Sequence, residues 1–111
     1  MKIEKRKKGD VLILDLKGKI LIGEGIDELR EAINTAVNEK ETKLLLNFKN
    51  VPYLDSTGLG EVVRSYTSVK KGGGVVKIVN LTNKVRDLLS VTKLITVFDT
   101  FEDEEKAVAS F

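Results

Sequence analysis

The sequence predicts an α/β fold in which a mostly parallel β-sheet carries one antiparallel hairpin at its edge. Apolar runs of strand length alternate with segments whose apolar residues recur at helical spacing. The first two strand candidates, in contrast, follow each other through the turn residues Gly9-Asp10 with no helix between them. Strands separated by helices pair in parallel, whereas directly joined strands form a hairpin. The expected order is therefore β-β-α-β-α-β-α-β-α.

The chain opens with this predicted hairpin. Residues 2–8 are weakly strand-like, and Val11–Leu16 is a continuous apolar run, which is typical of a strand covered on both faces. The first strand carries the only local excess of positive charge, at Lys2, Lys5, Arg6, Lys7 and Lys8. We interpret this cluster as the solvated face of a hairpin, because a phosphate-binding surface needs more such charges on one face.

A loop and a helix follow the hairpin. The loop, residues 18–25, is unusually apolar at Ile20, Leu21 and Ile22. Helical spacing then relates Ile26, Leu29, Ile33, Ala36 and Val37. Acidic residues in the first turn and a lysine near the end suit the helix dipole, so these residues predict a helix.

The second half of the chain continues the alternation of strands and helices. We predict strands at residues 43–48, 75–79 and 95–98, and a helix that runs to Lys70-Lys71 and stops at Gly72. A short helix with Val85, Leu88 and Leu89 is expected to be capped by Asn80 or Thr82. A last helix should begin within residues 101–105, after Thr100, with acidic residues in its first turn, and bury Val108 and Phe111.

Composition excludes several classes of function. A chain of 111 residues with 41% hydrophobic and 32% charged residues is expected to form one domain over residues 1–111. Its net charge of +2 does not indicate direct nucleic-acid binding. Without Cys or His, no thiolate or histidine metal site or Ser-His pair can form, and we expect no metal or cofactor. With no signal pattern or long apolar run, a cytoplasmic protein without a membrane partner is expected.

The most informative stretch is residues 51–60, which joins the third strand to the second helix. Asp55, Ser56 and Thr57 are all favourable N-cap residues at the mouth of that helix. Gly58 and Gly60 are expected to leave the first turn without bulky side chains and open to a partner's backbone. The stretch therefore predicts a presented hydroxyl group, although the same residues could simply cap the helix.

Catalytic interpretations of this stretch lack the groups they need. Asp55 stands where a response-regulator receiver carries its phospho-acceptor, but Asp10 and Asp15 do not supply the acidic pair after the first strand that would hold magnesium. Ser56 as a nucleophile would depend on a lysine or carboxylate base. A small serine-dependent enzyme is thus kept only as an alternative. The run Gly72-Gly73-Gly74 is not followed by Gly-Lys-Ser or Gly-Lys-Thr, so we interpret it as a helix stop and turn.

These residues resemble a known family. The motif Asp55-Ser56-Thr57-Gly58-Leu59-Gly60 after a leucine-rich strand, the β-β-α-β-α order, and three glycines before the next strand are similar to bacterial anti-sigma factor antagonists of the STAS type. The resemblance implies a STAS-like fold and phosphorylation of Ser56 by an anti-sigma factor that is itself a serine kinase. It further implies that the unphosphorylated form binds this kinase through the motif and frees its sigma factor, and that a phosphoserine phosphatase reverses the modification.

One departure from that family concerns the loop before the first helix. Relatives often carry an acidic residue where this chain has Leu21, after Gly18-Lys19-Ile20, and the loop here is a residue longer and more apolar. The departure bears on partner identity more than on the phospho-acceptor. A scaffold subunit of a larger stress-signalling complex, in which Ser56 is rarely phosphorylated, is a further alternative.

Overall fold

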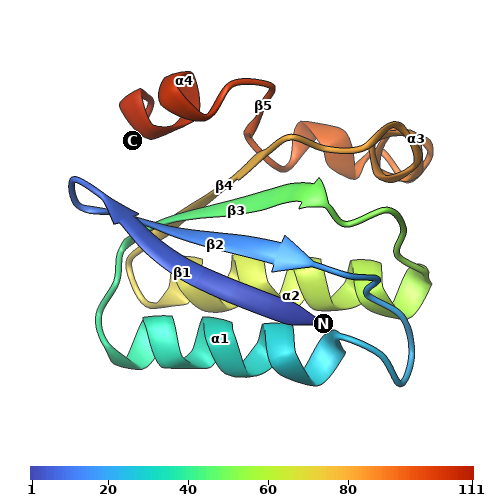
Figure 1. The fold of residues 1–111 in the computed structure, drawn as a ribbon, viewed down its shortest axis with the longest axis horizontal. Helices are drawn as coiled ribbons and strands as arrows, with labels where there is room; N and C mark the ends of the chain where they lie inside the picture. The colour runs from blue at the N-terminus through green and yellow to red at the C-terminus, as the bar shows by residue number, and fades with distance from the viewer.

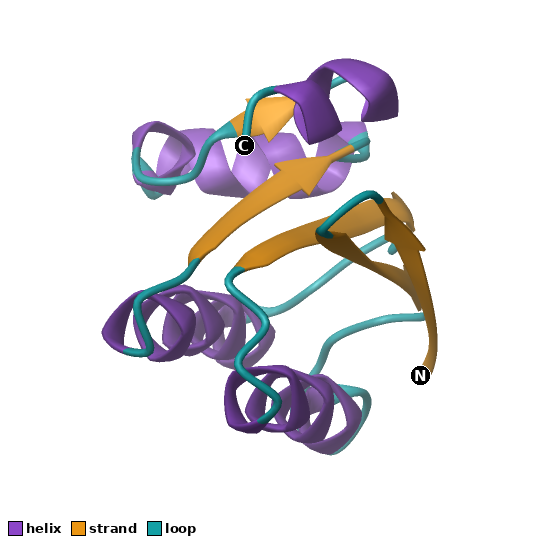
Figure 2. Cartoon of the chain, turned by 90° about the vertical axis from the view of Figure 1, so that its left-hand side faces the viewer, coloured by secondary structure: helices purple, strands orange, loops and turns teal.

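The computed structural model describes residues 1–111 as a five-stranded sheet with helices on both faces (Figures 1 and 2). The strands lie in the order β1 (Lys2–Lys8), β2 (Val11–Lys17), β3 (Lys43–Asn50), β4 (Val75–Val79) and β5 (Thr100–Phe101). Only β1 and β2 pair antiparallel. One face is covered by α1 (Ile26–Asn38) and α2 (Ser56–Lys71), whose core also includes Val85 and Leu89 of α3 (Asn83–Val91), and α4 (Glu104–Ala109) packs on the opposite face. The predicted fold class and element order are confirmed.

The strand β2 is buried on both of its faces, as the unbroken apolar run predicted. Leu12, Leu14 and Leu16 belong to the main core beneath α1 and α2. Val11 and Ile13 point to the opposite face, where they form a smaller core with Ala107 of α4. Because successive residues of a strand point to opposite faces, a strand between two helical layers needs no polar positions.

The prediction was wrong at the end of the chain. Residues 95–98 are not a strand: a 3₁₀ helix spans Leu94–Thr96, and the fifth strand is the short Thr100–Phe101. Local β propensity is overridden here because Phe98 is buried in the main core, while pairing with β4 occurs only further on. The last helix begins at Glu104, with Asp103 as its N-cap, and Ala107 is its fully buried residue; Val108 and Phe111 are only partly buried.

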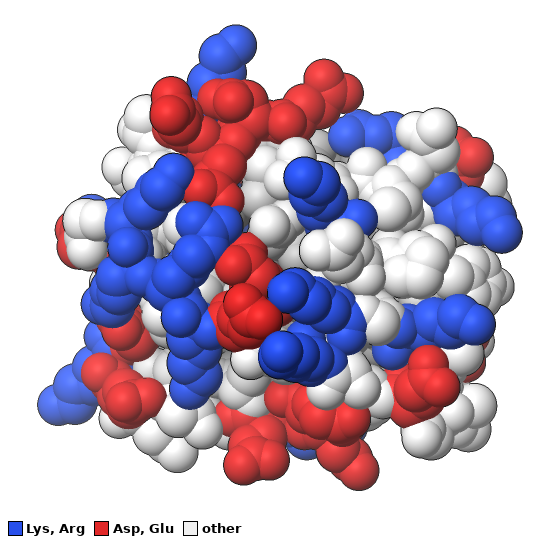
Figure 3. Space-filling model, viewed as in Figure 1, with Lys and Arg blue, Asp and Glu red and all other residues white.

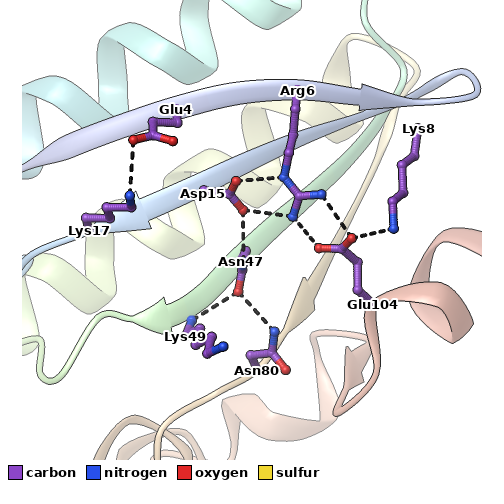
Figure 4. A network of polar contacts seen from close by, with 9 residues as sticks. All are labelled: Glu4, Arg6, Lys8, Asp15, Lys17, Asn47, Lys49, Asn80 and Glu104. Atoms are coloured by element: carbon purple, nitrogen blue, oxygen red, sulfur yellow. Dashed lines mark hydrogen bonds and ion pairs between the residues drawn. The ribbon is translucent and has the colours of Figure 1, made fainter.

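The basic cluster of β1 is not uniformly solvated. Figure 3 shows lysine and arginine side chains gathered around the β1 edge with acidic side chains between them. Arg6 departs from this pattern because it lies in a network with β2 and α4 (Figure 4). Its Nε donates to Asp15 Oδ2 at 2.7 Å and its Nη1 donates to Glu104 Oε2 at 3.0 Å. The interpretation as a solvated hairpin face is therefore corrected for Arg6, which ties α4 to the sheet.

This network makes stability depend on acid. Hydrogen bonds from Arg6, and then from Lys8, lower the pKa of Glu104 from 4.5 to about 2, and a hydrogen bond from Arg6 also lowers the pKa of Asp15. A carboxylate whose pKa is depressed by folding stabilises the protein above its unfolded pKa and loses that contribution as the pH falls through its folded pKa. Because Arg6 is 38% exposed, we expect a loss of about 1–2 kcal/mol between about pH 5 and pH 2.

Urea denaturation at several pH values checks this expectation. Arg6→Gln should unfold more easily at neutral pH and show a flatter dependence between about pH 5 and pH 2, since its carboxylates lose their main partner. An Arg6→Gln variant with the same acid dependence as the wild-type chain would contradict the assignment of the effect to this network.

Two further features complete the description of the fold. The ammonium group of Lys77 donates to the backbone carbonyl of Ser110 at 2.8 Å and lies over the ring of Phe111, which anchors the end of α4. None of the helices combines the length and the apolar character required to cross a membrane.

Candidate functional site

The site is built where the loops after β2 and β3 run side by side. The amide of Ile20 donates to the carbonyl of Tyr53 at 3.3 Å, and the amide of Asp55 donates to the carbonyl of Ile20 at the same distance. Ile20 and Leu54 form an isolated parallel bridge, and both side chains are buried. The two loops therefore extend the parallel pairing beyond the strands and bring the start of α2 against residues 20–22.

Asp55 is the N-cap of α2 among the three predicted candidates. Its backbone is extended, and its Oδ1 accepts a hydrogen bond from the Gly58 amide at 2.7 Å. Its Oδ2 accepts a second bond from the amide of Ile22 at 3.0 Å. These bonds, first from Ile22 and then from Gly58, hold the pKa of Asp55 below its usual value. The carboxylate thus caps the helix and fastens the loop before α1 to it.

Ser56 and Thr57 are the first two residues of α2, and both are exposed. Neither hydroxyl has a hydrogen-bond partner within the chain. Both carboxylate oxygens of Asp55 are occupied by backbone amides, so the neighbouring acid is not placed to take a proton from Ser56. The geometry presents a free hydroxyl at a helix N-terminus without an activating base.

The two glycines of the motif have different surroundings. A Cβ atom on Gly58 would lie 1.9 Å from the carbonyl oxygen of Ile20, so Gly58 is required by the chain's own packing. The expectation that Gly58 leaves the first turn open is thereby corrected. Gly60 is exposed, and a Cβ there would meet nothing within 4 Å. Leu59 is 8% exposed and belongs to the main core. The accessible surface of the motif is formed by Ser56, Thr57 and Gly60.

The turn at residues 21–24 is a neighbour of the site that the sequence analysis did not include. Leu21 and Glu24 exchange two backbone hydrogen bonds of 2.8 and 2.9 Å, and the Ile22 side chain at the tip is 75% exposed. Tyr53, from the loop after β3, is also exposed, at 44%. The apolar run at Ile20-Leu21-Ile22 was the available signal, but it did not distinguish the buried Ile20 from the exposed Ile22.

A buried carboxylate follows directly after the motif. Glu61 is 3% exposed between α1 and α2. Its Oε1 accepts a bond of 2.7 Å from Arg30 Nη2 and its Oε2 one of 2.9 Å from Arg64 Nε. Hydrogen bonding to Glu61 raises the pKa of Arg30. The sequence alone did not indicate that Glu61 is buried. It stands between apolar positions of α2, and only the packing of α1 against α2 decides which way its side chain points.

The fold and the site together are those of a known family. A sheet with one antiparallel edge, helices on both faces and a free serine at the mouth of α2 defines a class of small α/β domain. The family model described as STAS domain matches residues 2–107. The chain belongs to the STAS domain family. No group of three or more acidic side chains in it could hold a metal ion.

The relatives of the chain identify a narrower class within this family. The chain is 36% identical over 80 residues to an anti-sigma-B factor antagonist of Bacillus subtilis, a match that covers 72% of each protein. It is 26% identical over 109 residues to an anti-sigma F factor antagonist of Paenibacillus polymyxa, covering 97% of this chain and 92% of that one. The structure of the Bacillus cell fate determinant SpoIIAA in the phosphorylated form is similar in fold, with a TM-score of 0.73, 19% identity and 98% coverage of both chains. Within the family, the chain is therefore placed among the anti-sigma factor antagonists.

Proposed function

We propose that this chain is an anti-sigma factor antagonist of the cytoplasm whose unphosphorylated form binds an anti-sigma factor kinase and frees the sigma factor. Phosphorylation of Ser56 ends this binding, and a phosphoserine phosphatase restores it. The observation that carries the proposal is the exposed, unbonded Ser56 hydroxyl at the first position of α2. The two relatives are named for different sigma factors, B and F, so we propose the class of protein and do not name a sigma factor.

The helix mouth suits a phosphate. A phosphoserine carries nearly two negative charges, and the N-terminus of a helix favours anions through its free backbone amides and its dipole. Asp55 already occupies the amide of Gly58, so the phosphate would extend outward from the first turn. The modification is therefore expected to leave the fold intact and to change the surface.

The same group is unfavourable against a bound partner. On a surface packed closely around Ser56, Thr57 and Gly60, a phosphate is bulky, must be desolvated and repels a facing carboxylate. A penalty of roughly 3 kcal/mol, similar to removing one partner of a buried charge pair, weakens binding by about two orders of magnitude. This is sufficient for a switch. The chain then acts as a binding module and a substrate of its partner, not as an enzyme.

Intact-mass analysis after incubation with candidate anti-sigma factor kinases and ATP tests the proposal. We expect the wild-type chain to gain the mass of one phosphate, Ser56→Ala to gain none, and the matched control Thr57→Ala to be modified like the wild type. In a binding assay with the same kinase, Ser56→Ala should bind like the wild type and Ser56→Asp roughly 100-fold more weakly. If both Ser56 variants bind like the wild type and neither changes phosphorylation, the proposal is wrong.

A further inference from the structure

Two arginines converge on one buried carboxylate at the outer junction of α1 and α2, the two helices that lie side by side in Figure 2. Arg30 of α1 donates from Nε and Nη2 to Glu61 Oε1, at 3.2 and 2.7 Å. Arg64 of α2 donates from Nε to Glu61 Oε2 at 2.9 Å. Both oxygens of the carboxylate are thus used to orient guanidinium groups.

The two guanidinium groups keep unused binding capacity. The side chains of Arg30 and Arg64 are 49% and 40% exposed, whereas that of Glu61 is 2% exposed. Nη1 of each arginine has no hydrogen-bond partner within the chain, and the Nη2 of Arg64 has only a 3.5 Å contact to Asn34. The negative charge of Asp27 favours the charged form of Arg30, but the two side chains form no ion pair. One buried negative charge therefore supports two outward-facing positive charges.

This pair of arginines lies on the same side of α2 as the modified serine. Positions 56, 60 and 64 recur every four residues and share one stripe of the helix. Gly60, between Ser56 and Arg64, carries no side chain and borders open space. Arg64 bonds to a residue three positions nearer the N-terminus, so its guanidinium group is directed back toward Ser56.

Packing of α1 on α2 does not by itself explain the triad. Replacing a buried ion pair or triad by apolar residues of similar volume is often neutral or stabilising, because desolvation of the charges offsets their attraction. What the triad does supply is two preoriented guanidinium forks, which recognise carboxylates with bidentate geometry.

We propose that Arg30 and Arg64, held by Glu61, form an anion-binding patch that receives acidic side chains of the anti-sigma factor bound at Ser56. The inference rests on the proposed function and names the chemistry of the partner: a carboxylate-bearing surface that spans from Ser56 across Gly60 to the arginines. It also explains the direction of the switch. A phosphate on Ser56 faces the same acidic surface that the arginines attract, so modification turns attraction into repulsion.

The test uses the kinase identified by phosphorylation of Ser56. The neutral variant Arg30→Gln/Glu61→Gln/Arg64→Gln removes both positive charges and also the buried carboxylate, so that no unpaired charge stays in the interior. It should bind the kinase about 10–100-fold more weakly, with a flatter dependence on salt, because rim charges act through screened attraction. Glu61→Gln alone keeps both positive charges and loses only part of their orientation, so it should weaken binding less than the neutral variant does. The matched control Arg86→Gln, on α3 and away from α1 and α2 in the sequence, should bind like the wild type.

Opposite outcomes overturn the inference. The triad would serve packing alone if the neutral variant bound the kinase with wild-type affinity and salt dependence. The same conclusion would follow if Glu61→Gln weakened binding as much as the neutral variant does. If the neutral variant does not fold, Arg64→Gln keeps Glu61 paired with Arg30 and should still bind roughly tenfold more weakly; wild-type binding by it overturns the inference. If Ser56→Asp weakens binding and the arginine variants do not, only the patch is wrong. If both Ser56 variants bind like the wild type and neither changes phosphorylation, the proposed function fails and the patch fails with it.

Discussion

Replacing Gly58 with alanine is expected to lower the free energy of unfolding by about 3 kcal/mol or more, at the upper end of overpacking effects. The added Cβ would lie 1.9 Å from the backbone oxygen of Ile20 and 2.8 Å from its carbonyl carbon. A backbone atom cannot rotate away as a side chain can, so the loop after β2 must move. That movement breaks the bond from the Asp55 amide to the Ile20 carbonyl and disturbs the cap that presents Ser56.

Gly60→Ala is the matched control, two residues along the same helix. Its Cβ meets nothing within 4 Å, and alanine is favoured over glycine inside a helix, so a gain of about 0.5–1 kcal/mol is expected. Urea denaturation followed by circular dichroism measures both variants. If Gly58→Ala were as stable as Gly60→Ala, the close approach of the two loops would not exist in solution.

The double variant Arg30→Ala/Arg64→Ala should also lose stability strongly, by about 3 kcal/mol. The reason is the carboxylate that stays behind. Glu61 is almost fully buried between α1 and α2, and both of its partners would be removed at once. A buried charge without a partner is among the few mechanisms that produce so large an effect, whereas half-exposed arginines alone contribute little.

Adding Glu61→Gln to that double variant distinguishes the cause. The neutral amide removes the buried charge, so we expect most of the lost stability to return in the triple variant, as measured by the midpoint of urea denaturation. Equal midpoints for the double and the triple variant would mean that the loss comes from the packing of the arginine stems and not from the orphaned charge.

Much of the fold could be predicted because its signals are local. The apolar run of β2, the helical spacing of α1 and the glycine after α2 each lie within one element, and all three elements were placed correctly. The prediction failed where local signals compete. Residues 95–98 carry strong β propensity, yet Phe98 is drawn into the core beneath the sheet and the strand forms two residues later.

At the site, the sequence alone determined that residues 55–57 lie at the mouth of a helix and that no His or Cys is present to activate Ser56. Capping preferences act over three or four residues, which is why this much can be read from the chain. The roles of the three residues divide only in the structure: Asp55 is the cap, and Ser56 and Thr57 are free. That Ser56 is the switch stays a prediction until it is tested.

Tertiary structure alone decided what surrounds that serine. Gly58 is closed by the backbone of Ile20, Asp55 holds the amide of Ile22 from 33 positions away, and Arg30 meets Glu61 across 31 positions. No local sequence pattern predicts these contacts, because they depend on the parallel pairing of β2 with β3 and on the packing of α1 against α2. The sequence determined which residue is presented, and the packing of distant segments determined the surface on which it is presented.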